Sequence, residues 1–251
     1  WKFLEDYMIP NLFPFIPKHV VLRRYDEINV YDLKKDESYI IDDEAHAVLK
    51  RVDGLTSNQG IVDSFPIKKQ EEVIEALDTF HSLGIVINTT EKVRKTELKS
   101  MKHIFLPERN PFDPPYLKNL MVNITERCNL SCKHCYITDK NPVDMALEKL
   151  LRLIEQFFEL QGIRLILTGG EPFLYEKLGD LLRELREIPL QKVILSNGVL
   201  IPDHLDLMEL LKENHVEVYV SLDGLKGAHD DFRNAECFSE TVEGIKTLLK
   251  H

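Results

Sequence analysis

The second half of the chain alternates apolar runs with amphipathic segments four times, and this alternation constrains the fold more than any other feature. Each apolar run is nearly continuous, which is typical of strands in a parallel sheet whose faces are covered. Four strand-then-helix units in succession predict a parallel α/β sheet or part of a β/α barrel. We expect strands at 120–125, 163–170, 192–198 and 216–224, and helices at 143–160, 174–187, 203–214 and 238–250.

A polar or glycine-rich segment follows or ends every predicted strand of this half. In α/β folds the chemistry gathers at the carboxyl ends of the strands, so we expect these four loops to share one rim and form a site. We call them the rim loops: the cysteine loop CNLSCKHCY at 128–136, GGEP at 169–172, SNG at 196–198 and SLDG at 221–224.

Three of the four cysteines lie within eight residues, as Cys128, Cys132 and Cys135. Thiolates are the usual ligands of iron–sulfur clusters, and a [4Fe–4S] cluster normally takes four of them. Three would leave one iron open, as in metal sites that act on a substrate. The alternative is a structural zinc site with His134 or Cys237 as fourth ligand. Cys237 has no partner in the pattern, so we expect a buried, small apolar residue there.

The first half predicts a different architecture. Three short β-rich runs precede three helices over residues 19–88, which indicates an α+β, winged-helix-like domain. Asp42 or Asp43 is expected to cap its first helix, and Gly84 to end its third. Residues 1–18 are interpreted as an N-terminal extension, residues 89–118 as a charged and proline-rich linker, and residues 119–251 as the β/α core.

Net charge, apolar run length and cysteine spacing argue against some classes of binding partner. The net charge of −10 argues against non-specific binding to a nucleic-acid backbone, because such binding needs a surplus of Lys and Arg. No apolar run approaches the ~20 residues that span a bilayer. Four unevenly spaced cysteines do not form a disulfide framework. We therefore expect a cytoplasmic protein without nucleic-acid or membrane partners.

The motifs CNLSCKHCY, GGEP, SNG and SLDG, in this order, resemble those of the radical S-adenosylmethionine (SAM) enzymes over residues 119–251. The tail from SLDG to TVEGIKTLL resembles the subgroup with a C-terminal SPASM or twitch extension. The first domain is similar to PqqD-like domains, which bind leader peptides of ribosomally made peptides. The resemblance implies a partial β/α barrel with four of about six β/α units present. The core is thus expected to be incomplete at its C-terminus, and auxiliary iron–sulfur clusters to lie in a further segment.

Site residues follow from the resemblance. Cys128, Cys132 and Cys135 would hold a [4Fe–4S] cluster whose free iron takes the amino and carboxylate groups of SAM. Glu171 would add negative charge near the SAM amine, and Arg233 would pair with the SAM carboxylate. The full set implied in SAM binding is His134, Gly169, Gly170, Glu171, Pro172, Ser196, Asn197, Ser221, Asp223 and Arg233.

The implied reaction is reductive cleavage of SAM to a 5′-deoxyadenosyl radical, with an electron donor such as ferredoxin or flavodoxin. Our preferred hypothesis is post-translational modification of a ribosomally made peptide, captured through its leader by the first domain. Two alternatives stay open. One is maturation of a protein or of a small cofactor of the haem or quinone type. The other is a non-catalytic, zinc-containing peptide-binding protein.

Overall fold

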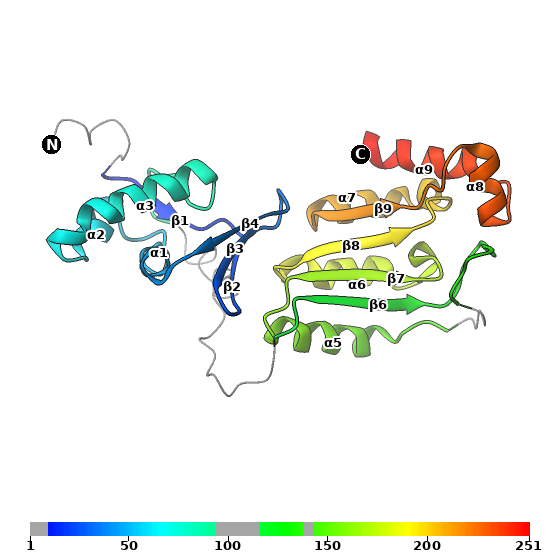
Figure 1. Cartoon of the computed structure of the whole chain (residues 1–251), viewed down its shortest axis with the longest axis horizontal. Helices are drawn as coiled ribbons and strands as arrows, with labels where there is room; N and C mark the ends of the chain where they lie inside the picture. Colours follow the sequence, from blue (N-terminus) through cyan, green and yellow to red (C-terminus); the bar gives the residue numbers. More distant parts are fainter. Residues whose placement is uncertain (1–9, 94–115, 138–142) are drawn as a thin grey trace. The chain divides into compact units, whose positions relative to one another are not determined.

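The computed structural model describes residues 10–93, 116–137 and 143–251. Contacts divide the chain into a first unit, Trp1–Asp113, and a second unit, Pro114–His251 (Figure 1). Much of the predicted linker at 89–118 and half of the predicted extension at 1–18 lie outside the described residues.

The first unit contains an antiparallel meander and three helices, in the predicted order. The strands β2, β3 and β4 pair in sequence, and the helices α1, α2 and α3 follow them along the chain. Alternate strand residues pack with α3, which buries Val73, Leu77 and Phe80 in the core of this unit. The bounds are β2 Val20–Arg24, β3 Ile28–Asp32, β4 Glu37–Ile41, α1 Asp43–Leu49, α2 Asn58–Asp63 and α3 Gln70–Leu83.

The predicted helix ends of this unit are confirmed. The Asp42 side chain accepts a hydrogen bond from the backbone N–H of Ala45 at 2.7 Å and so caps α1. Gly84 ends α3 with a φ of 77°, the left-handed conformation that glycine adopts without steric cost.

A two-stranded sheet in the first unit was not expected from the sequence. The strand β1, Phe13–Phe15, pairs antiparallel with β5, Ile87–Thr89. Each strand has three residues, which is too short for an alternating pattern to be recognised. Pro14 in β1 also argues against a strand in a sequence-based prediction, because proline has no N–H to donate.

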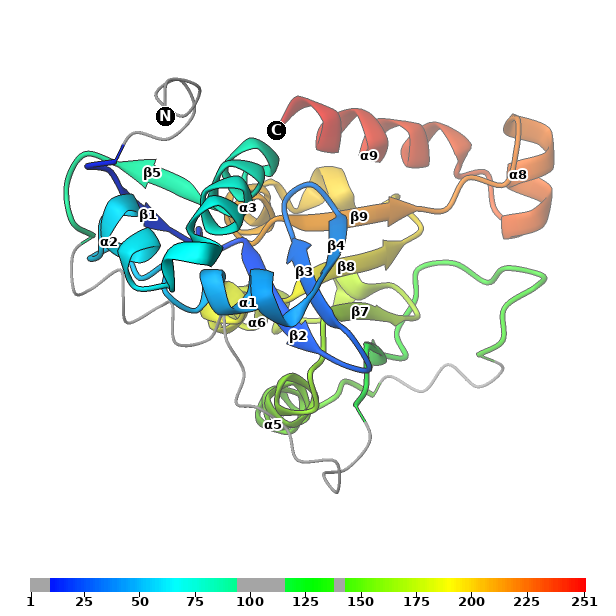
Figure 2. The same cartoon turned by 60° about the vertical axis from the view of Figure 1, so that its left-hand side comes forward.

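The second unit confirms the parallel α/β architecture. Its four strands pair in parallel, in the order β6-β7-β8-β9. The helices α5, α6 and α7 share one core with alternate strand residues, so they cover one face of the sheet (Figures 1 and 2). The bounds are β6 Asn119–Thr125, α5 Leu147–Glu159, β7 Arg164–Gly169, α6 Leu178–Glu184, β8 Gln191–Ser196, α7 Met208–Glu213 and β9 Val216–Val220.

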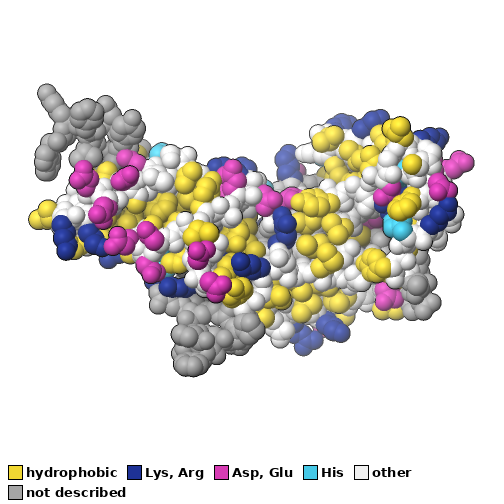
Figure 3. All heavy atoms as spheres, in the orientation of Figure 1, with side chains coloured by type: hydrophobic (Ala, Val, Ile, Leu, Met, Phe, Trp, Pro, Cys, Tyr) yellow, Lys and Arg dark blue, Asp and Glu magenta, His cyan; other side chains and the backbone are white. Residues whose placement is uncertain are grey.

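The other face of this sheet is less covered. Met121 of β6 is 60% exposed and Tyr219 of β9 is 49% exposed, and hydrophobic side chains gather on the surface of this unit (Figure 3). In a β/α barrel the face opposite the helices lines the interior. A sheet with this one-sided covering is therefore compatible with part of a radical SAM-type β/α core.

Two helices complete the second unit. The helix α9, Phe238–Lys250, has the predicted bounds, whereas α8, Lys226–Arg233, was not predicted. Short 3₁₀ turns replace the ends of the helices expected at 174–187 and 203–214. No helix in the described ranges is long and apolar enough to span a bilayer.

Candidate functional site

The rim loops follow the carboxyl ends of four neighbouring strands, and hydrogen bonds join each loop to the next. The backbone N–H of Gly170 donates to the carbonyl of Thr125 at the end of β6. The N–H of Ser221 donates to the carbonyl of Ser196, which links the loops after β8 and β9 at 3.0 Å. The predicted rim is therefore one connected structure.

The carboxylate of Glu171 holds the loops after β7 and β8 together. Its Oε1 accepts from the Ser196 hydroxyl at 2.8 Å and from the Phe173 N–H at 3.2 Å, and its Oε2 accepts from the Asn197 N–H at 2.8 Å. The residue is fully buried, and this burial raises the pKa of the carboxyl although the three hydrogen bonds and Arg233 oppose the rise. The Glu171 side chain thus points into the protein and acts as a link between loops.

The two glycines of the GGEP loop are required by a close backbone approach. A Cβ at Gly169, which has a φ of 139°, would lie 2.1 Å from the carbonyl oxygen of Thr125. A Cβ at Gly170 would lie 2.1 Å from the carbonyl oxygen of Arg127. The N–H of Glu171 donates to that same carbonyl at 2.8 Å. Only glycine lets this loop rest against the start of the cysteine loop.

Asn197 connects the rim to the cysteine loop. Its Nδ2 donates to Oδ1 of Asn129 at 2.8 Å, and its carbonyl accepts from the Thr241 hydroxyl at 3.1 Å. Neither Asn129 nor Thr241 was predicted from the sequence to belong to the site. The position of Asn129 directly after Cys128 was the signal that could have identified it.

The three clustered cysteines are partly exposed on their loop, whereas Cys237 is buried, as predicted. Nη1 of Arg233 lies 3.7 Å from the sulfur of Cys132, as a donor to it. Burial raises the pKa of the Cys237 thiol, which makes it a poor metal ligand. Within the ranges that the structure describes, no three His, Cys, Asp or Glu side chains surround a single point that could hold one metal ion.

The helix α8 packs against the cysteine loop. The ring of His134 stacks on the ring of Phe232, with centroids 4.2 Å apart and planes 21° from parallel. The Lys133 N–H donates to the carbonyl of Phe232, and its ammonium pairs with Asp231. One face of the His134 ring is therefore covered by a ring of the protein itself.

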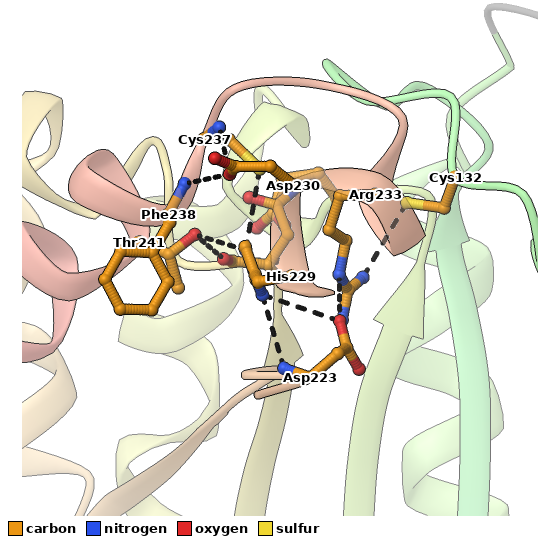
Figure 4. Close-up of polar contacts among 10 residues, drawn as sticks. Cys132, Asp223, His229, Asp230, Arg233, Cys237, Phe238 and Thr241 are labelled. Carbon is orange, nitrogen blue, oxygen red and sulfur yellow. Dashed lines mark hydrogen bonds and ion pairs between the residues drawn. The ribbon is translucent and has the colours of Figure 1, made fainter. Parts of the chain in front are cut away.

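Asp223 and Arg233 form an ion pair at the end of β9. Nε of Arg233 donates to Oδ2 of Asp223 at 2.6 Å, and the Arg233 side chain is 9% exposed (Figure 4). Burial disfavours the charge on Arg233, but its contacts with Cys132 and Asp223 outweigh this effect and raise its pKa. Ser221 is exposed beside them, and Pro172 is buried at the start of a 3₁₀ turn.

A second ion-pair group anchors the base of the cysteine loop. Nε of Arg127 donates to Asp144 at 3.1 Å, and Nη1 donates to Glu176 at 3.0 Å. The Thr125 hydroxyl donates to the same Asp144 carboxylate at 2.6 Å. These residues join the end of β6 to the segment before α5.

The part of the chain that carries the rim loops is similar to known proteins. Residues 122–251 match the family described as the Radical SAM superfamily. The chain is 24% identical to the antilisterial bacteriocin subtilosin biosynthesis protein AlbA of Bacillus subtilis (strain 168), over 97% of the chain and 57% of AlbA. It is 33% identical to a GTP 3′,8-cyclase of Petrotoga mobilis, over 52% of the chain and 42% of the cyclase.

Among solved structures, Streptococcus suis SuiB bound to its precursor peptide SuiA matches with a TM-score of 0.65 at 18% identity. This match covers 94% of the chain and 54% of SuiB. SuiB bound to S-adenosylmethionine matches with a TM-score of 0.63. These likenesses show a shared fold, and the chain spans between half and three fifths of the length of AlbA and SuiB.

Proposed function

This chain belongs to the radical SAM superfamily, and we propose that its rim loops bind a [4Fe–4S] cluster and SAM in order to modify a peptide. The observation that carries this proposal is the position of the three-cysteine loop. It follows the first strand of the matched region, is hydrogen-bonded to the SNG loop through Asn129 and Asn197, and is linked to Asp223 of the SLDG loop through Arg233. The GGEP loop is hydrogen-bonded to Thr125 and Arg127 just before the cysteine loop.

The donor set fits an iron–sulfur cluster. Cys128, Cys132 and Cys135 are thiols on one partly exposed loop, and the guanidinium of Arg233 lies within hydrogen-bonding distance of the Cys132 sulfur. Thiolates are the usual ligands of iron–sulfur clusters, and three of them leave one iron of a [4Fe–4S] cluster open. The all-thiol donor set and the family match therefore support the cluster over zinc.

When bound, the cluster and SAM would together supply a radical that removes a hydrogen atom from the substrate. The protein's part is to bind and orient them. We propose that the backbone of residues 169–172 receives the SAM amine, while Glu171 keeps that loop in place from within. His134, Ser221 and Asp223 lie on the exposed side of the rim and are proposed to contact SAM, together with the buried residues Arg233, Ser196 and Asn197.

A peptide substrate is supported by the relatives that extend over both units. AlbA, which is named for bacteriocin biosynthesis, is similar over 97% of the chain, and SuiB was solved with a precursor peptide. The similarity to the GTP 3′,8-cyclase covers only 52% of the chain. Because the peptide-related proteins share the first unit as well, we favour peptide modification over maturation of a small cofactor.

The first unit offers features suited to peptide capture. β4 is an edge strand of its sheet, and Ile40 on it is 64% exposed, so an extended peptide could add to this edge. A pocket of about 570 Å³ opens beside the end of β4. Its lining is mainly apolar with an acidic margin: Asp42, Asp43, Glu44, Ala45, Ala47, Val48, Phe65, Pro66, Lys69, Glu72, Val73 and Ala76.

The cluster proposal is tested by electron paramagnetic resonance on the anaerobically reconstituted, dithionite-reduced full chain, with and without SAM. We expect a reduced-cluster signal that changes when SAM is added. Replacement of Cys128, Cys132 or Cys135 by Ala should abolish the signal, while Cys237→Ala should keep it. Stoichiometric zinc without such a signal would contradict the proposal.

Peptide capture is tested with a fluorescent synthetic copy of a short peptide encoded beside this protein's gene. The Ala76→Trp variant fills the pocket from α3 and should weaken binding at least tenfold. Glu75→Trp, one residue earlier on the exposed side of α3, is the matched control and should bind as the unaltered chain does. Equal binding by both variants would exclude the pocket as the capture site.

A further inference from the structure

The contact between Arg233 and Cys132 is not explained by binding of SAM alone. In the structure the guanidinium donates through Nη1 to the Cys132 sulfur at 3.7 Å and through Nε to Asp223 at 2.6 Å (Figure 4). The guanidinium therefore has a defined position between a proposed cluster ligand and a carboxylate of the rim.

Asp223 is itself held in place by a buried histidine. Nδ1 of His229 accepts a hydrogen bond from the backbone N–H of Asp223 at 3.2 Å, and His229 is completely buried. The opposite ring nitrogen lies 3.5 Å from both the Cys237 sulfur and the Thr241 hydroxyl. These contacts fix Asp223 relative to α8 and α9.

The C-terminal part of α8 is fixed as well. The Asp230 carboxylate accepts from the N–H groups of Cys237 and Phe238 at 3.0 and 2.8 Å, which joins α8 to the start of α9. Asn234 ends α8 with a φ of 56°. Because Arg233 is the last residue of α8, this arrangement limits the positions that its side chain can reach.

We propose that Arg233, oriented by Asp223, is a positioning residue that raises the reduction potential of the cluster bound through Cys132. This inference rests on the proposed function, since it requires a cluster at the three cysteines. Hydrogen bonds and positive charge at a cluster ligand favour the reduced, more negative form, and such contacts are among the factors that set cluster potentials. Arg233 carries several N–H donors, so this role leaves donors for the SAM carboxylate.

Because Arg233 and Asp223 carry opposite charges, replacing one or the other should shift the reduction potential of the cluster in opposite directions. Replacing Arg233 by Gln removes the positive charge beside the thiolate and should make reduction harder. Replacing Asp223 by Asn removes the negative charge that neutralises Arg233 while keeping an oxygen that can accept from Nε. The cluster should then become easier to reduce. If the two variants only damaged the structure of the cysteine loop, there would be no reason for their potential shifts to have opposite signs.

The experiment is a redox titration of the reconstituted full chain without SAM, followed by electron paramagnetic resonance, with iron content measured for every variant. For Arg233→Gln we expect a fall of about 59 mV, which corresponds to a roughly tenfold change in a one-electron equilibrium. Asp223→Asn should shift the potential upward. Arg152→Gln removes an equal charge from the exposed side of α5 and should leave the potential unchanged.

An unchanged potential in Arg233→Gln, or shifts of the same sign in both variants, would overturn the inference. If Arg233→Gln fails to hold a cluster, Asp223→Asn carries the test alone, and an unchanged potential there would equally overturn it. Failure of the unaltered chain to bind a cluster is a different result, because it refutes the proposed function itself.

Discussion

Replacement of Glu171 by Ala tests whether the rim is held together from its buried side. The change removes the acceptor of three hydrogen bonds. The Ser196 hydroxyl and the Asn197 N–H, which are buried, then lose the carboxylate that accepts from them. An unsatisfied buried donor costs about 1–3 kcal/mol. Loss of the buried charge offsets part of this cost. We therefore expect a loss of roughly 2–4 kcal/mol in the second unit, a large share of the 5–15 kcal/mol typical of a domain.

Hydrogen exchange measured by mass spectrometry can localise this loss within the intact chain. Peptides that cover residues 191–198 should exchange roughly 30- to 1000-fold faster in Glu171→Ala, because their opening free energy falls by the stated amount. Glu176→Ala is the matched control on the same side of the rim. Its carboxylate is 76% exposed and pairs with Arg127, so its loss should cost less than about 1 kcal/mol. Equal exchange in the two variants would refute the role assigned to Glu171.

The carboxyl group of Glu171 also predicts that the free energy of unfolding depends on pH. Burial raises the pKa of Glu171 above its unfolded value of 4.5, although the hydrogen bonds from Asn197, Ser196 and Phe173 oppose this. The folded chain then binds the proton more tightly than the unfolded chain. Its contribution to stability is present below pH 4.5 and is lost as the pH rises through the higher folded pKa. Glu171→Gln should lack this component, and a difference between the two chains that does not vary with pH would contradict the argument.

Two further predictions concern backbone and charge. Gly170→Ala should destabilise the second unit by more than about 2 kcal/mol in urea unfolding, because its Cβ would meet the Arg127 carbonyl, whereas Gly227→Ala in α8 meets nothing within 4 Å and should be neutral or stabilising. Burial lowers the pKa of Lys192 to about 8, with Glu187 opposing. The unfolded chain then binds more protons than the folded chain between pH 8 and 10.5, so stability should rise with pH in this range. The Lys192→Met variant should be more stable than the unaltered chain at pH 7 and should lack this rise in stability. If the two chains depend on pH in the same way, the prediction is wrong.

The position of the site could be predicted from the sequence because buried parallel strands leave continuous apolar runs. Once β6 to β9 are recognised, the polar segments after them must share one edge of the sheet. The direction of a single side chain leaves no such pattern. Glu171 was expected to lie at this rim, but its burial between two loops of its own chain could not be predicted from the sequence.

The segment KGAHDDFR in α8 shows the same limit. Its sequence has too few apolar residues to produce a helical period, so the helix was not predicted, and His229 received no role. The structure places this histidine at 0% exposure, in polar contact with Asp223 after β9 and with Cys237 and Thr241 at the start of α9. Burial of a lone polar residue depends on tertiary packing, which local sequence does not encode.

The packing of α9 against the loop after β8 determines when the rim can be completed during synthesis. Thr241 supplies the hydroxyl that binds the Asn197 carbonyl, and a Cβ at Gly244 would lie 2.0 Å from the Gly198 carbonyl oxygen. Thr241 is made 44 residues after Asn197, a delay of roughly 2–9 s at ordinary rates of translation. The loop after β8 therefore leaves the ribosome before the residues that pack against it have been made, and its native contacts form only after α9 has been synthesised.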